Sequence, residues 1–178
     1  MLTYLLNHRE YLEAADQLAP NRLLFNGLAF YTLGKILNHD QAVKVASSFI
    51  NAAVQQVHQE GYFIESGGFD SSYNGVATAL GLRLLLMGYD KDNLDTVSRK
   101  AILWQKSRIS ETGEILTTGN SRVKPSGGGE SFLGRTKDVD AGHTVEAFML
   151  ASQFFSDQES VELASNVLTH YREQSQKQ

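Results

Sequence analysis

The sequence of 178 residues contains no cysteine. Disulfide bonds, thiolate zinc sites and cysteine nucleophiles are therefore excluded, although the absence of cysteine fits the cytoplasm and the cell exterior alike. No window approaches the roughly 20 apolar residues needed to cross a bilayer. The first ten residues lack a basic lead-in followed by a long apolar stretch, so they predict a helix and not a secretory signal. We therefore expect a soluble protein without membrane partners, and a cytoplasmic one if Met1 is the native start.

Long blocks of one charge are also missing. The chain carries 16 basic and 20 acidic residues, which gives a formal net charge of -4. This balance disfavours nucleic acid and acidic membrane surfaces as partners. The length fits a single core, so we expect residues 1–178 to form one helical domain, either complete or part of a longer chain.

Helical periodicity dominates what is present. Between residues 41 and 60, apolar side chains recur at steps of three and four, for example at Val45, Phe49 and Ala53. This spacing predicts an amphipathic helix that Asp40 caps and Gly61 ends. The same reasoning predicts six further helices, at residues 3–18, 22–38, 73–87, 93–108, 140–155 and 158–174. The fold class is therefore all-α, with about seven helices.

The predicted helices are of two kinds. The segments 22–38, 73–87 and 140–155 are apolar nearly all round, whereas 41–60, 93–108 and 158–174 are apolar on one side. A helix that is apolar all round must be buried by its neighbours. Because the two kinds alternate along the chain, we expect an inner layer of helices wrapped by an outer one.

Two long connections, 61–72 and 109–139, lead into inner helices and should gather at one end of the domain. A weak internal repeat places Asp70-x-x-Tyr73 in parallel with Asp140-x-x-His143, each at a predicted helix start. Exposed N–H groups at such starts favour anions or hydroxyl-rich ligands. The loop 109–139 is either a lid over this face or a plain connection. Its three glycines, 127–129, lack the Lys-Ser/Thr ending of a phosphate-binding loop.

Two stretches carry a resemblance, Gly61-Tyr62-Phe63-Ile64-Glu65 and Asp70-Ser71-Ser72-Tyr73-Asn74-Gly75. They resemble the inner-helix entries of α/α-toroid polysaccharide lyases of the heparinase and alginate lyase kind, and of related toroid glycosidases. The likeness covers residues 21–174 in architecture but only these stretches in sequence. It implies an incomplete α/α toroid that cleaves uronate-containing polysaccharides by β-elimination. We expect no cofactor, and no metal site, because the histidines outside the candidate site show no paired spacing such as i, i+4.

The resemblance also implies roles for individual residues. Tyr73 and His143 become the acid and base candidates, and Asn74 with Arg135 would bind the substrate carboxylate. The polar and aromatic residues of the same face complete the expected substrate site, namely Tyr62, Glu65, Asp70 and Asp140. Asp70 and Asp140 equally fit plain helix caps. A complete toroid has nearly twice as many helices, so a second subunit, as in a homodimer, or a longer natural chain would supply the rest.

Two alternatives remain open. The first is a non-catalytic helical repeat module that serves as an interaction scaffold. The second rests on the stretch from Phe132 to Asp140 with His143 beyond it, which is similar to an inner-helix entry in the β subunits of protein prenyltransferases, also toroids. In that family the aspartate binds zinc alongside a cysteine. Since this chain has no cysteine, only the helical layout of an isoprenoid-type toroid is implied, and not the metal.

Overall fold

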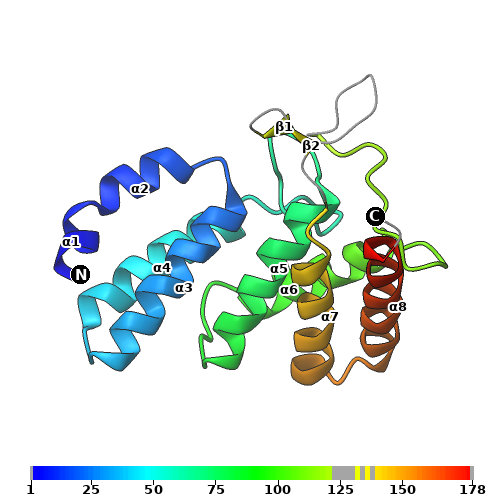
Figure 1. Ribbon diagram of the computed structural model, residues 1–178. Coiled ribbons are helices and arrows are strands. Elements are labelled where there is room, and N and C mark those ends of the chain that lie inside the picture. Colours follow the sequence, from blue (N-terminus) through cyan, green and yellow to red (C-terminus); the bar gives the residue numbers. More distant parts are fainter. Residues whose placement is uncertain (1, 122–130, 133–134, 137–138, 177–178) are drawn as a thin grey trace.

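The computed structural model describes residues 2–121, 131–132, 135–136 and 139–176, with side chains for 3–121 and 139–176. Over these residues the chain forms eight α-helices and one antiparallel pair of two-residue strands (Figure 1). This confirms the predicted all-α class. The elements are α1 (Leu2–Asn7), α2 (Arg9–Asp16), α3 (Pro20–Ile36), α4 (Asp40–Val54), α5 (Ser71–Leu86), α6 (Leu94–Lys106), β1 (Ser131–Phe132), β2 (Arg135–Thr136), α7 (Ala141–Phe155) and α8 (Gln158–Ser175).

The helices pack in three consecutive pairs, α3 with α4, α5 with α6, and α7 with α8. In addition, α5 contacts both α3 and α7, so these three helices form a row (Figure 1). They are the segments whose apolar residues lie nearly all round. The middle helix of the row is the most buried, with eleven of its sixteen residues in the core. Burial is thus greatest in the apolar helix that lies between two others of the same row.

Glycines allow the closest approaches between these helices. A Cβ added at Gly75 of α5 would lie 2.5 Å from the Thr144 hydroxyl oxygen of α7, and one at Gly27 of α3 would lie 2.6 Å from Ile50 of α4. Both separations are far below an ordinary carbon contact, so any side chain would force the helices apart. The two glycines therefore set the spacing of α5 and α7 and of α3 and α4.

The first predicted helix, residues 3–18, is wrong as a single element, because it divides into α1 and α2 at His8. The backbone of His8 has φ -107° and ψ 9°, outside the helical range. Its ring lies back along α1, with Nδ1 2.8 Å from the Tyr4 carbonyl oxygen and the ring stacked on that of Tyr4. The apolar periodicity of the segment continues through this break, so the pattern alone could not show it.

The predicted helix 41–60 is also wrong at both ends. Its cap is His39, whose Nδ1 accepts a hydrogen bond from the Ala42 N–H at 3.3 Å, while Asp40 is the first helical residue. A carboxylate in the first turn still stabilises the helix dipole. The helix stops at Val54, and the chain then turns back on itself so that Val57 pairs with Phe63. Val57 continues the helical spacing of apolar residues but belongs to this hairpin.

The same hairpin recurs after α6. Ile109 pairs with Ile115 as Val57 pairs with Phe63, so the two hairpins align residue for residue. Each turns on a glycine with positive φ, Gly61 at +106° and Gly113 at +84°. Each glycine also lies against the backbone of the next outer helix, Gly61 at Lys100 of α6 and Gly113 at Asn166 of α8. The hairpins therefore connect every outer helix to the one that follows it.

Candidate functional site

The starts of α5 and α7 are joined by hydrogen bonds. Asp70 caps α5, accepting from the Ser72 N–H at 3.0 Å and the Tyr73 N–H at 3.1 Å. Asp140 caps α7 by accepting from the His143 N–H at 3.0 Å. The Asp140 N–H in turn donates to the Ser72 hydroxyl at 2.8 Å. Tyr73 follows Asp70 by three positions, as His143 follows Asp140. The two residues therefore occupy equivalent places in the first turns of adjacent helices.

These hydrogen bonds confirm that Asp70 and Asp140 cap helices, which is one of the two roles that the sequence allows for them. Asp70 is 5% exposed, so it faces the interior of the loop cluster. Asp140 is more open, with 41% of its side chain exposed. Its second carboxylate oxygen lies 2.8 Å from Nδ1 of His143, whose side chain is 35% exposed. One carboxylate thus caps a helix and also orients a histidine at the surface.

Asn74 lies in a buried polar network beneath this surface. It is 1% exposed, its side-chain oxygen accepts from the Phe63 N–H at 3.1 Å, and its amide nitrogen donates to Gln105 Oε1 at 2.9 Å. Gln105 donates to the Ser71 carbonyl oxygen at 3.1 Å. Each of these polar groups is matched by a partner, as buried polar groups require. The network holds the 61–70 loop, α5 and α6 together.

Aromatic rings form a second layer around the loop. Tyr62, Phe69 and Trp104 contact one another with centroid distances of 5.1 to 5.7 Å. Tyr62 is 8% exposed, and burial, followed by the charge of Glu60, raises the pKa of its hydroxyl. Tyr62 therefore serves this structure as a packing residue with a protonated hydroxyl at neutral pH.

Arg108 joins the aromatic layer to the second loop. Its guanidinium lies 4.9 Å from the centre of the Phe69 ring and donates to the Ser71 hydroxyl at 3.0 Å. It also donates to the carbonyl oxygens of Leu116 and Thr118 at 2.9 and 2.7 Å. Burial lowers the pKa of this guanidinium, which nevertheless stays charged at neutral pH. Arg108 therefore fixes the first part of the 109–139 loop against α5.

Glu65 lies in the 61–70 loop and is 3% exposed. Its carbonyl oxygen accepts from the Ser121 hydroxyl at 2.6 Å, and the Ser121 N–H donates to the Phe69 carbonyl oxygen at 2.8 Å. The two long loops are therefore attached to each other at residues 65–69 and 121, as the sequence predicts for loops that gather at one end. The predictions for the Arg135 side chain and for residues 122–130 lie outside the described residues.

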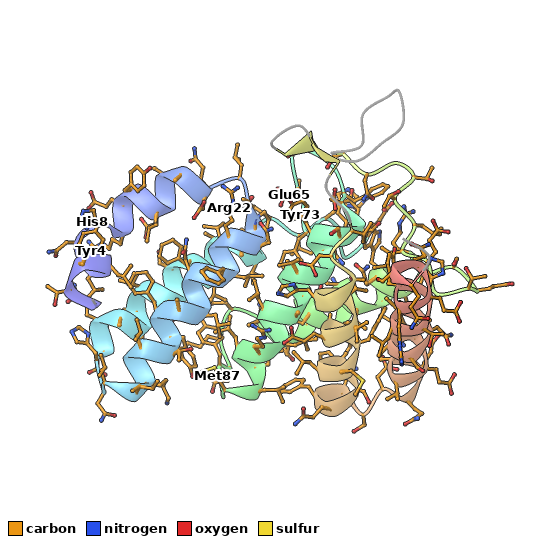
Figure 2. All side chains as sticks on the ribbon, in the orientation of Figure 1. Tyr4, His8, Arg22, Glu65, Tyr73 and Met87 are labelled. Carbon is orange, nitrogen blue, oxygen red and sulfur yellow. The ribbon has the colours of Figure 1, made fainter. Side chains whose placement is uncertain are left out.

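The sequence interpretation missed three residues of this region. Ser72 links the two caps, Arg108 fixes the loop, and Arg22 at the start of α3 presents a side chain that is 64% exposed. Figure 2 shows Arg22 at the same end of the molecule as Glu65 and Tyr73. In the repeated hairpins Arg108 aligns with Gln56, and both side chains donate to backbone carbonyl oxygens. This repeat is the signal that could have identified Arg108 as a residue that fixes a loop.

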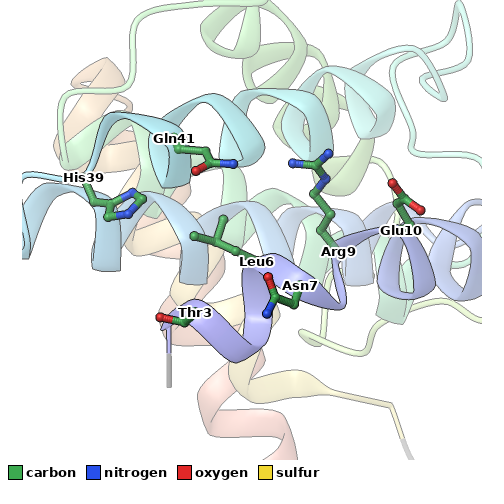
Figure 3. A pocket seen from close by; sticks show the side chains of 7 residues that line it. All are labelled: Thr3, Leu6, Asn7, Arg9, Glu10, His39 and Gln41. Carbon is green, nitrogen blue, oxygen red and sulfur yellow. The ribbon is translucent and has the colours of Figure 1, made fainter.

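Two of the cavities among the described residues lie elsewhere in the molecule. One of about 450 Å³ opens between α1, the start of α2 and the start of α4 (Figure 3). Its lining residues are Thr3, Leu6, Asn7, Arg9, Glu10, His39 and Gln41. The other, of about 380 Å³, lies at the far ends of α3 and α5, between Tyr31 and Lys91. Neither cavity contains Tyr73 or His143, so neither bears on the acid and base candidates.

Within the described ranges, no three His, Asp or Glu side chains are grouped closely enough to hold a metal ion. None of the helices in the same ranges combines the length and the apolar character required to cross a bilayer. Comparisons with protein-family models, with curated proteins and with solved structures found no match to this chain.

Proposed function

We propose that this chain cleaves a uronate-containing polysaccharide by β-elimination at the joined starts of α5 and α7. The observation that carries the proposal is the pairing of Asp140 with His143, at 2.8 Å and partly exposed. A carboxylate on Nδ1 holds a neutral imidazole in the tautomer whose Nε2 accepts protons. The pair thus supplies an oriented, partly exposed base at the starts of two neighbouring helices, which the carboxylates of Asp70 and Asp140 cap.

β-Elimination needs two such groups. A base removes the proton at C5 next to the uronate carboxylate, a C4–C5 double bond forms, and the bond from C4 to the bridging oxygen breaks. That oxygen then takes a proton from an acid. His143 fits the base because Asp140 orients it, and Tyr73, in the equivalent place on α5, fits the acid. Because the Asp140 N–H bonds to the Ser72 hydroxyl and so joins the two helix starts, we infer that both groups act on one substrate.

The substrate carboxylate also needs neutralising, because charge develops on it as the C5 proton leaves. The amide of Asn74 is already engaged by Phe63 and Gln105. Arg22 is the better described candidate for binding the substrate carboxylate. Its side chain is exposed, and its ion pair with Asp16 is long at 3.5 Å, so the guanidinium can turn to a ligand. The binding of the substrate carboxylate by Arg135 stays a prediction.

The test is incubation with a panel of uronate polysaccharides, followed through the ultraviolet absorbance of the unsaturated product. We expect absorbance to rise for at least one substrate, and to stop rising in the double variant Tyr73→Phe with His143→Ala. The matched control is Tyr4→Phe with His8→Ala, which alters the stacked pair formed by Tyr4 of α1 and His8 between α1 and α2, away from α5 and α7 (Figure 2). It should keep full activity.

Two outcomes would refute the lyase proposal. One is no absorbance change with any substrate, and the other is an unchanged rate in the Tyr73 and His143 double variant. New reducing ends without absorbance would instead identify a hydrolase, which the toroid glycosidase resemblance also allows. Measuring both products in the same samples separates these reactions.

A non-catalytic helical module is the second candidate. The repeated hairpin favours it, because Gly61 and Gly113 attach successive outer helices in the same manner, as in proteins built from stacked helical repeats. A pull-down that recovers one stoichiometric protein partner, together with no product from any polysaccharide, would support this alternative. The isoprenoid alternative has no described residue in its favour beyond the helical layout.

A further inference from the structure

The cavity of about 380 Å³ lies at the end of α5 opposite the candidate site. It opens between the end of α3, the first two turns of α4 and the connection from α5 to α6, and its lining residues run from Tyr31 to Lys91. Figure 2 shows Met87, which precedes this connection, at the end of the molecule away from Tyr73. Helix α5 has 16 residues, so about 24 Å of helix separates its two ends. A ligand in this cavity is therefore independent of the proposed β-elimination.

Two tyrosine rings form an apolar wall of the cavity. Tyr31 of α3 and Tyr89 of the connection meet edge to face, with their centroids 5.3 Å apart, and both residues are buried. The hydroxyl of Tyr89 donates to the Asp92 carboxylate, which fixes this ring in place. Gly88 also lines the cavity, and no atom lies within 4 Å of a Cβ added there. A firm aromatic wall therefore borders open space.

The two helix ends at the cavity share one geometry. A residue in the left-handed conformation follows each helix, Asn38 after α3 with φ +50° and Gly88 after α5 with φ +87°. The next N–H donates back to the carbonyl oxygen five residues earlier, at 2.8 Å in α3 and 3.0 Å in α5. This arrangement closes a helix end without any ligand, so the cavity is preformed. Because α3 and α5 end here and α4 begins, backbone dipoles of both signs border it.

Charged side chains of both signs line the same cavity, namely Lys35, Asp40, Asp90 and Lys91. All four residues are exposed, and none of them forms an ion pair with a described residue. The Lys35 ammonium lies 6.0 Å from the centre of the Tyr31 ring, so the charges adjoin the aromatic wall. A ligand with a single charge would be attracted by one pair and repelled by the other. A ligand with an ammonium and a carboxylate can bind both pairs.

We propose that this cavity binds a free amino acid in its zwitterionic form, with an apolar side chain against the two tyrosine rings. The ligand carboxylate pairs with Lys35 and Lys91, and its ammonium pairs with Asp40 and Asp90. The apolar wall and the few polar groups around it are the usual combination in a small-molecule site, where the wall holds the ligand and the polar groups orient it.

The size of the cavity suits such a ligand. A volume of about 380 Å³ has room for roughly a dozen water molecules, and hence for an amino acid with an aromatic side chain. The four charged side chains are exposed, so water and salt screen their attraction for the ligand. We therefore expect a dissociation constant in the millimolar range.

The experiment is an NMR titration of the full chain, in which the backbone amide signals are followed as ligand is added. The probes are L-phenylalanine, phenylethylamine, which lacks the carboxylate, and 3-phenylpropionate, which lacks the ammonium. We expect phenylalanine to bind at least tenfold more tightly than either analogue, since a hydrogen bond between charged groups contributes about that factor. The Gly88 amide signal should shift on binding, whereas that of Gly75, in the first turns of α5, should not.

A double variant tests the role of the charges. Lys35→Met with Lys91→Met should weaken phenylalanine binding at least tenfold, while the affinity for phenylethylamine, which has no carboxylate to lose, should not fall. The matched control is Lys44→Met with Lys100→Met, at two exposed lysines that do not line this cavity, and it should bind phenylalanine as the unchanged chain does. Circular dichroism of both variants verifies that they are folded, as the exposure of all four lysines leads us to expect.

Three results would overturn the proposal. The first is no shift of the Gly88 signal at phenylalanine concentrations well above the millimolar range. The second is equal affinity for phenylalanine and for one of its analogues, because the cavity would then recognise a single charge or only the ring. The third is unchanged phenylalanine binding in the Lys35 and Lys91 double variant, because the amino acid would then bind elsewhere.

Discussion

The replacement Gly113→Ala tests the packing of the second hairpin on α8. Gly113 has φ +84°, and an added Cβ would lie 2.5 Å from the Asn166 carbonyl carbon and 3.0 Å from the Val167 nitrogen. Both contacts are with helix backbone, which cannot move aside as a flexible side chain can. Alanine at this position therefore has two costs, the left-handed conformation and the collision with α8.

The control that separates these costs is Gly88→Ala. Gly88 has φ +87°, nearly that of Gly113, but no atom lies within 4 Å of an added Cβ. Its replacement should cost about 1 to 2 kcal/mol, the energy of a left-handed alanine. Gly113→Ala should cost about 2 kcal/mol more, because overpacking against a fixed structure typically costs 1–3 kcal/mol. Gly61→Ala, which meets the Lys100 carbonyl oxygen at 2.7 Å, should resemble Gly113→Ala.

Urea unfolding measured by circular dichroism gives these free energies. With a slope of about 2 kcal/mol per molar urea, an additional 2 kcal/mol lowers the midpoint by about 1 M relative to Gly88→Ala. If Gly113→Ala and Gly88→Ala lower the midpoint equally, the hairpin does not pack on α8 as described. The alignment of α6 with α8 would then be wrong.

Three further changes have defined outcomes in the same assay. Asn74→Leu should destabilise by about 3 kcal/mol, since it removes the acceptor of the buried Phe63 N–H and the side-chain donor to Gln105 Oε1. Ser98→Ala should stabilise by about 1 kcal/mol, because the buried hydroxyl of Ser98 has no hydrogen-bond partner among the described residues. Lys106→Met should cost about 1 to 2 kcal/mol at pH 7 by removing the ion pairs with Asp157 and Glu159. Burial alone would raise the pKa of Asp157, but hydrogen bonds from Lys106 and Ser160 outweigh it and lower that pKa, so the cost of Lys106→Met should disappear as pH falls below about 4.

Part of the candidate site can be predicted from the sequence, and part of it is decided by the fold. The parallel between Asp70-x-x-Tyr73 and Asp140-x-x-His143 is visible in the sequence, because capping depends on neighbours within one turn. The bond from the Asp140 N–H to the Ser72 hydroxyl joins residues 68 positions apart, so no local pattern reveals it. Likewise, the resemblance implies that Asn74 binds the substrate carboxylate, but the Asn74 amide is buried and bonded to the Phe63 N–H and to Gln105.

The sequence by itself determined the helical class, the alternation of two kinds of helix and the caps of α5 and α7, because each depends on periodicity or on contacts within a turn. Only the tertiary structure decided where helices end when apolar spacing continues, as at His8 and Val57, since a break or a hairpin can satisfy the same spacing. It alone decided how deeply an apolar helix is buried. Helices α5 and α7 have similar patterns, but α5 packs between two helices of the inner row, α3 and α7, whereas among the described residues α7 packs against only one of them, α5.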